Sequence, residues 1–227
     1  MATPVNARAD ILRRVRGALA DVPGLERPAD VPVARDYRRR DTAGDPGGRF
    51  LNRVAAYRAG AHRSTPEAVQ ATIARLLDGH GARRVAVPDG LPGTWCAAVP
   101  EPVRDGPLTV AELDRVDGVL TGCAVAIADT GTVVLAGGPG QGRRALTLLP
   151  DLHVCVVGGE QVVGTVPEAL ERLAALGLAG APLTLVSGPS ATSDIEMSRV
   201  EGVHGPRRLE VVLVGAEAAV SPDAGPG

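Results

Sequence analysis

Short apolar runs alternate with amphipathic segments along most of the chain. Apolar residues recur at helical spacing between Pro66 and Gly79, which predicts a helix there. The same reading predicts helices at about 49–59, 110–116 and 166–176, and strands at 84–88, 152–157, 183–186 and 209–214. Strands that alternate with helices in this way indicate an α/β domain with a mainly parallel sheet.

The stretch from Val119 to Leu135 is apolar except for one turn, Asp129-Thr130-Gly131-Thr132. This pattern predicts two strands joined by a tight turn, or one strand that turns into another at a sheet edge. Residues 92–117 are rich in Pro and Gly, and only the short helix stands out there.

The first 48 residues are expected to form an arm outside the domain core. Apolar and Arg side chains alternate at helical spacing over 7–20, which predicts a basic amphipathic helix that lies on the domain or on a second subunit. Residues 21–48 contain four prolines and no hydrophobic period, which indicates an extended or mobile connector. We therefore expect an arm over 1–48, an α/β domain over 49–214 and a disordered tail over 215–227.

Charge is divided unevenly between the two parts of the chain. Residues 1–63 hold 13 Arg and 7 acids, a balance of +6, whereas the remainder holds 11 Arg and 19 acids, a balance of −8. The whole chain has a net charge of −2 and only four aromatic residues with which to stack on bases. Nucleic-acid binding through the basic arm is therefore the weakest of the functions considered.

The chain contains no lysine, because all 24 basic residues are arginines. This excludes mechanisms that need an amine, such as a Schiff base or the lysine of a phosphate-binding loop. Ala, Gly, Arg and Pro abound, so we attribute the missing lysine to the codon bias of a GC-rich genome.

Three cysteines, Cys96, Cys123 and Cys155, are too widely spaced for a zinc site or an iron–sulfur cluster. We expect buried free thiols, no bound metal or resident cofactor, and a purified protein that is colourless and iron-free. No apolar stretch approaches the roughly 18 residues that span a bilayer, and no secretory signal is recognisable. A cytoplasmic location is expected.

Ligands in open α/β sheets bind beyond the carboxyl ends of the strands, so the segments that follow predicted strands are candidate sites. Two such segments are the turn at Asp129 and the loop 137–144. Asp129 is a candidate base or nucleophile, although a carboxylate between hydroxyls and a glycine is also typical of a turn. The glycine-rich loop 137–144 suits a phosphate, with Arg143 or Arg144 adding charge. It lacks a phosphate-loop lysine and the G-x-G-x-x-G spacing, so this signal is weak.

Two further segments stand near the C-terminal end of the domain. In 187–196, hydroxyls and the free N–H groups of an expected helix suit an anion, while Ser193, Asp194 and Glu196 also fit a local helix cap. In 202–208, His204 is a candidate acid, base or anion donor, or a structural residue in a Gly-Pro turn. His153 and Cys155 alternate along a strand and are interpreted as packing residues.

Four stretches carry a resemblance to a known family: TGCAVAIADTGTVVL, LLPDLHVCVVGGEQVV, SGPSATSDIEMSRVEGVHGPRRLEVVLV and the opening ARADILRRVRGALA. Together they resemble the lactate utilization protein C family, which carries the LUD domain. The likeness covers most of the chain and is strongest over 119–214.

The resemblance implies a three-layer α/β fold similar to the sugar-phosphate isomerase and CoA-transferase group, distantly related to 5-formyltetrahydrofolate cyclo-ligase. It also implies a role in oxidising L-lactate to pyruvate with iron–sulfur partner proteins. The family pattern places these residues around the site: Thr130, Gly131, Ser187, Gly188, Ser190, Asp194, Glu196, His204, Gly205 and Arg207. Thr132 is added to these candidate ligand-binding residues because it belongs to the same turn as Thr130 and Gly131.

One departure from the family concerns Asp129, where the family usually has a Glu before T-G-T. The shorter side chain would place a nucleophilic carboxylate differently. The catalytic candidates are therefore Asp129, Glu196 and His204, and the chain's own activity stays open.

Two functions of different classes follow. Removing a hydride from lactate needs a flavin, a nicotinamide or a metal centre, and the sequence carries no motif for one. The first hypothesis is therefore a non-redox component of a lactate oxidation system, with a small-anion site between the 129–132 turn and the 187–207 segment. The alternative is a freestanding CoA-transferase-like or cyclo-ligase-like enzyme that uses Asp129. Either allows a homo-oligomer.

Overall fold

A computed structural model describes residues 7–22, 27, 33–34, 36–41, 44–106, 108–192, 200–201 and 204–215. The chain divides into two compact units, Met1–Arg38 and Arg39–Gly227. In the first unit, the expected amphipathic helix is present as α1 (Ala7–Ala18), and none of its residues is buried.

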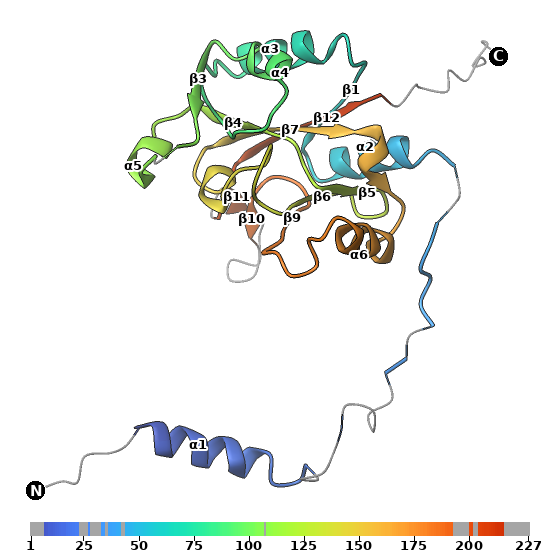
Figure 1. Cartoon of the computed structure of the whole chain (residues 1–227), viewed down its shortest axis with the longest axis vertical. Coiled ribbons are helices and arrows are strands. Elements are labelled where there is room, and N and C mark those ends of the chain that lie inside the picture. The colour runs from blue at the N-terminus through green and yellow to red at the C-terminus, as the bar shows by residue number, and fades with distance from the viewer. Residues whose placement is uncertain are drawn as a thin grey trace, which may run out of the picture. The chain divides into compact units, whose positions relative to one another are not determined.

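The second unit contains the helices and strands of the α/β domain (Figure 1). Its helices are α2 (Pro46–Ala56), α3 (Val69–Gly79), α4 (Gly93–Cys96), α5 (Val110–Leu113) and α6 (Val166–Ala175), with 3-10 turns η2 (Arg144–Thr147) and η3 (Gly159–Gln161). Its strands are β1 (Gly60–Ser64), β2 (Arg84–Val87), β3 (Glu101–Arg104), β4 (Gly118–Thr121), β5 (Val125–Ile127), β6 (Thr132–Leu135), β7 (Leu152–Gly158), β8 (Val162–Val163), β9 (Thr184–Val186), β10 (Ala191–Thr192), β11 (Val200–Glu201) and β12 (Arg208–Val214).

The main sheet has six strands in the order β1-β12-β7-β4-β2-β3, and every neighbouring pair is parallel. The α/β class and mainly parallel sheet predicted from the sequence are therefore confirmed. Strand β7 is almost wholly buried, and β12 is buried at Leu209 and over Val211–Leu213, as expected for central strands covered on both faces.

A second sheet, in the order β8-β5-β6-β9, packs against the main one. The predicted tight turn joins β5 to β6, which pair antiparallel. The apolar stretch that contains them also includes a third strand, β4, which belongs to the main sheet. The chain therefore crosses from one sheet to the other between β4 and β5.

Three apolar clusters define the layers. On one face of the main sheet, α3 and α4 pack against β2 and the even-numbered residues of β7. On the other face, α2 and the second sheet cover the odd-numbered residues of β7 and β12. Helix α6 covers the outer face of the second sheet. Figure 1 shows α3 and α6 on opposite sides of the stacked sheets.

Two strands of the main sheet were not predicted. Strand β1 has the sequence GAHRS and β3 has the sequence EPVR, and both are edge strands with largely polar, partly exposed side chains. An edge strand with exposed side chains needs no continuous apolar run, so hydrophobic pattern alone misses it.

Candidate functional site

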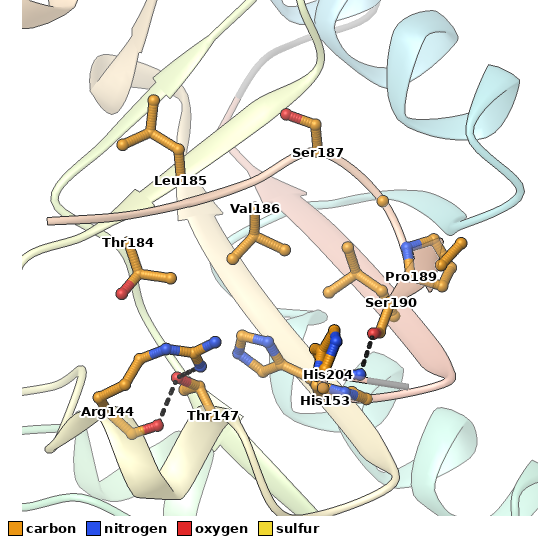
Figure 2. A pocket seen from close by; sticks show the side chains of 15 residues that line it. Arg144, Thr147, His153, Thr184, Leu185, Val186, Ser187, Pro189, Ser190 and His204 are labelled. Atoms are coloured by element: carbon orange, nitrogen blue, oxygen red, sulfur yellow. Dashed lines mark hydrogen bonds between the residues drawn. The ribbon is translucent and has the colours of Figure 1, made fainter. Parts of the chain in front are cut away.

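A cavity of about 310 Å³ opens between the second sheet and the start of β7 and β12 (Figure 2). Its walls come from β9, the loop 187–190, the first residue of β10, the loop 204–206, η2 and the starts of β7 and β12. It is lined by Arg144, Thr147, His153, Thr184, Leu185, Val186, Ser187, Gly188, Pro189, Ser190, Ala191, His204, Gly205, Pro206 and Leu209. We call it the basic pocket.

The basic pocket lies at an unexpected end of the main sheet. His153 and Leu209 are the second residues of β7 and β12, so the pocket adjoins the amino ends of these central strands. The loop 187–190 nevertheless follows the carboxyl end of β9 in the second sheet. The expectation that ligands bind beyond the carboxyl ends of strands therefore applies to β9, whose carboxyl end leads into the loop. It does not apply to the main sheet, because the pocket adjoins the amino ends of β7 and β12.

The ionisable side chains in the described lining are Arg144, His153 and His204, and no Asp or Glu is among them. Four hydroxyl residues complete its polar surface: Thr147, Thr184, Ser187 and Ser190. Guanidinium, imidazole and hydroxyl groups donate hydrogen bonds to a carboxylate or a phosphate oxygen. The described lining is therefore suited to a small anion.

Hydrogen bonds join the two loops of the pocket. The backbone N–H of His204 donates to the Ser190 hydroxyl at 3.0 Å, and the Ser190 N–H donates to the Pro206 carbonyl at 2.8 Å. Figure 2 shows Ser190 and His204 side by side at one end of the pocket and Arg144 at the other. The two loops therefore hold His204 opposite the wall that carries Arg144.

Two of the glycines predicted near the site adopt backbone conformations with a positive φ. Gly188 has φ +99° and packs on Tyr57, where a Cβ atom would come within 2.6 Å of the tyrosine Cβ. Gly205 also has a positive φ and lies against Ser190. A side chain at Gly188 would therefore push the loop away from Tyr57 and alter the pocket wall.

A chain of hydroxyls connects the pocket loop to the β5–β6 turn. The Oγ1 atoms of Thr130 and Thr132 are 2.7 Å apart, and the Thr132 Oγ1 atom is 2.7 Å from the Ser187 Oγ atom. Thr130 and Thr132 thus reach the site through Ser187 and do not line the basic pocket.

Asp129 takes part in an ion pair outside the basic pocket. The Arg49 Nε atom lies 3.3 Å from Asp129, and Arg49 also lies 3.1 Å from Asp41. At Gly131, where φ is +62°, a Cβ atom would come within 2.8 Å of the backbone of α2. The turn is therefore packed on α2, and Asp129 faces an arginine of that helix.

Arg207 likewise has a partner outside the pocket. Its Nε atom lies 2.5 Å from an Asp151 carboxylate oxygen, and the hydrogen bond and charge of Asp151 raise the pKa of the guanidinium. Both residues line a neighbouring cavity of about 490 Å³ with Asp114. The structure therefore gathers Ser187, Gly188, Ser190, His204 and Gly205, and separates Asp129 and Arg207 from them. Asp194 and Glu196 lie outside the described residues.

The glycine-rich loop directs several of its polar groups into the protein rather than toward a phosphate. Gly140 donates to the Asp89 carbonyl, and Gln141 and Gly142 donate to the Gly138 carbonyl. Arg143 bonds to Asp105 and to a backbone carbonyl. Of the two arginines predicted to add charge here, it is Arg144 that lines the basic pocket.

Among the polar residues of the pocket wall, three were not predicted as site residues: Thr147, His153 and Thr184. Arg144 was predicted only as part of a phosphate-binding loop. These residues come from a 3-10 turn and from strands, where a polar side chain carries no local signal of function. The one available signal was a buried histidine: His153 is 1% exposed and interrupts an apolar strand.

In the part of the chain that the structure describes, no cluster of three or more His, Cys, Asp or Glu could hold a metal ion. The described helices include none with the length and apolar character required to cross a bilayer.

Comparisons with known proteins match most of the domain. The LUD domain model matches residues 109–214. Lactate utilization protein C of Deinococcus radiodurans is 54% identical over 168 residues, which is 74% of this chain and 76% of that protein. Lactate utilization protein C of an Exiguobacterium species is 33% identical over 144 residues, or 60% of this chain and 62% of that protein.

A solved structure has the same architecture. The crystal structure of a DUF162 family protein from Deinococcus radiodurans superposes with a TM-score of 0.64 at 41% identity. The match covers 81% of this chain and 100% of that one. The fold described above is therefore shared with an experimentally determined relative.

Proposed function

Because this chain belongs to the LUD domain family that includes lactate utilization protein C, we propose that it is a non-redox component of an L-lactate utilization system. In this role it binds a small carboxylate in the basic pocket. The oxidation of lactate to pyruvate is carried out with iron–sulfur partner proteins.

The observation that carries the proposal is the set of hydrogen-bond donors in the pocket, with Arg144 as its guanidinium. Its described lining offers Arg144, His153 and His204 and no carboxylate. A monoanion such as lactate or pyruvate gains charge-assisted hydrogen bonds there, and nearby hydroxyls can bond its second oxygen atom. The cavity of about 310 Å³ is at the lower end of the range for small-molecule sites.

The proposed division of labour is supported by the redox motifs that the sequence lacks. Lactate oxidation transfers two electrons, and the sequence has no dinucleotide fingerprint and no closely spaced cysteines. The electron acceptor is therefore assigned to the partners, while this chain binds the acid and positions it.

The carboxylate-nucleophile alternative receives less support from the geometry. Asp129 pairs with Arg49 at 3.3 Å and is absent from the described lining of the basic pocket. A carboxylate that is ion-paired is a weaker nucleophile, since its charge is already neutralised.

The ligand proposal is tested by thermal melting of the full chain with L-lactate, pyruvate or phosphate. A ligand that binds the folded state raises the melting temperature by mass action. Arg144→Gln should remove most of the rise, because Arg144 lines the pocket. Arg143→Gln is the matched control, since this neighbour pairs with Asp105 outside the pocket. Equal rises in the two variants would overturn the ligand site.

The partner proposal is tested by purifying the tagged full chain from the cells that produce it. We expect co-purified proteins that bring stoichiometric iron and thiolate-to-iron absorption bands. The chain expressed alone should carry neither. Absence of iron proteins from the native complex would contradict the proposed partners.

A further inference from the structure

Two thiols and two other polar side chains form a cluster behind the wall of the basic pocket. His153 lines the pocket, and its Nε2 atom lies 2.7 Å from the Thr121 hydroxyl. Thr121 is the register partner of Cys155, which follows His153 on the same face of β7. All three residues are buried, with exposed fractions of 1% or less.

The second thiol belongs to Cys123, just beyond the end of β4. The Cys155 Sγ atom lies 3.8 Å from the carbonyl oxygen of Gly122, the residue that precedes Cys123. Both cysteines lie in the apolar cluster between the two sheets. The crossing from the main sheet to the second sheet thus brings Cys123 beside Cys155.

Gln161 fixes the peptide that carries Cys123. Its side-chain amide donates to the Cys123 carbonyl at 2.6 Å, and its Oε1 atom accepts from the Gly158 N–H at 2.7 Å. The same Oε1 atom lies 3.7 Å from the Cys123 sulfur. Gln161 therefore ties the Cys123 peptide to the end of β7, the strand whose middle carries Cys155.

The surroundings make the two thiols unequal. A hydrogen bond from the Cys123 thiol lowers the pKa of Cys155, burial opposes this, and His153 and Thr121 lower it further. The hydrogen bond to Cys155 and burial raise the pKa of Cys123. The Cys155 sulfur is thus the more readily ionised of the two, and a thiolate is the form that reacts with oxidants.

We propose that Cys123 and Cys155 are a redox-active pair that closes to a disulfide when a small hydroperoxide enters beside His153. The Cys155 thiolate attacks one peroxide oxygen; for hydrogen peroxide the O–O bond breaks, hydroxide leaves and takes a proton to become water, and Cys155 becomes a sulfenic acid. The Cys123 thiol then attacks the Cys155 sulfur. The S–S bond forms and a second water leaves with the thiol proton and the hydroxyl of the sulfenic acid.

In the net reaction the two thiols lose two electrons and two protons, and one hydrogen peroxide is reduced to two waters. The closed disulfide lies two residues from His153 on the same strand. The reaction involves the two cysteines and the hydroperoxide. It takes no electrons from lactate, so it is separate from the non-redox role proposed for this chain in lactate oxidation.

The third cysteine provides the control. Cys96 is also buried and free, but it packs in the apolar cluster on the opposite face of the main sheet with α3. Burial in the core is common to all three thiols, so a difference between them tests the cluster and not burial.

The experiment treats the full chain under folded conditions with hydrogen peroxide, blocks remaining thiols after denaturation, and maps the peptides by mass spectrometry. We expect two of the three thiols to be lost, a linked peptide joining Cys123 to Cys155, and Cys96 to be alkylated. A thiol reductant should restore all three. Mapping needs no mutation, so it does not depend on whether a core variant folds.

Single substitutions separate the two steps. Cys96→Ser should keep the linked pair, and Cys123→Ser should leave a sulfenic acid on Cys155 that dimedone labels. Cys155→Ser should show neither product. The proposal is overturned if the folded wild-type chain keeps all three free thiols, if the linked peptide contains Cys96, or if the link joins two copies of the chain.

Discussion

The Nε atom of Arg49 lies 3.3 Å from a carboxylate oxygen of Asp129, so helix α2 is tied to the turn between β5 and β6. Both side chains are about one quarter exposed. Asp129→Asn should therefore lower the free energy of unfolding by about 1 kcal/mol, the upper end for a partly exposed ion pair. Urea denaturation measures this change.

The same substitution should leave the ligand-induced rise in melting temperature unchanged, because Asp129 is outside the described lining of the basic pocket. Glu101→Gln is the stability control: its ion pair with Arg83 is more than half exposed on both sides. If Asp129→Asn abolishes a turnover measured for the isolated chain, the hypothesis of a binding component is wrong and that of an enzyme with a carboxylate nucleophile is supported.

Gly131 is predicted to tolerate no side chain, since two separate costs act there. Its φ of +62° strains any residue with a Cβ atom, and that atom would lie 2.8 Å from the backbone of Val54. Gly131→Ala should cost about 3 kcal/mol of unfolding free energy from strain and overpacking together.

Gly177 separates the two costs. Its φ is +74°, but nothing lies within 4 Å of the position of a Cβ atom. Gly177→Ala should therefore cost only about 1 kcal/mol from strain. Equal losses in the two variants would show that the contact between the turn and α2 contributes nothing.

Elements with a complete apolar face were predictable from the sequence. Strands β7 and β12 and helices α3 and α6 all lie within two or three residues of their expected bounds. The edge strands β1 and β3 were not, since both are largely polar and carry no continuous apolar run, and their backbone partners lie elsewhere in the chain.

The site divides in the same way. Ser190 and His204 were predicted as site residues because serine and histidine in Gly- and Pro-rich loops carry a local signal, and both line the basic pocket. His153 was interpreted as packing, since nothing in its strand indicates that Ser190 and Arg144 meet there. The partners of Asp129 and Arg207, which are Arg49 and Asp151, are 80 and 56 residues distant in sequence. No local pattern encodes such pairs.

Glu210 should make the free energy of unfolding depend on pH in the acid range, below the ordinary pKa of a glutamate side chain. Burial raises its pKa, but hydrogen bonds from His62 and His80, at 2.6 and 2.8 Å, outweigh burial and the net pKa is lowered. A lowered folded pKa means that this contribution is full above the unfolded value of 4.5. It is lost as pH falls through the folded pKa.

Glu210→Gln should therefore lower the unfolding free energy by about 2 kcal/mol near neutral pH, as for a hydrogen-bonded carboxylate. The difference from wild type should shrink below pH 4.5. Glu171→Gln, whose partner Arg40 is largely exposed, is the control and should show little change. A difference that stays constant down to acid pH would contradict the carboxylate's role.

Ser190 is predicted to affect ligand binding more than stability. Its hydroxyl accepts the His204 backbone N–H at 3.0 Å, and both residues line the basic pocket. In Ser190→Ala, water can replace the lost acceptor because His204 is exposed, so the unfolding free energy should fall by only about 1 kcal/mol. The pocket loses a hydroxyl and a fixed loop, so the melting-temperature rise with lactate or pyruvate should fall to less than half.

Ser64→Ala is the control for Ser190→Ala. It removes a comparable side-chain hydrogen bond, 3.2 Å to Thr72, outside the pocket and should keep the full rise. If both serine variants keep the full rise, the Ser190–His204 contact does not shape the binding site.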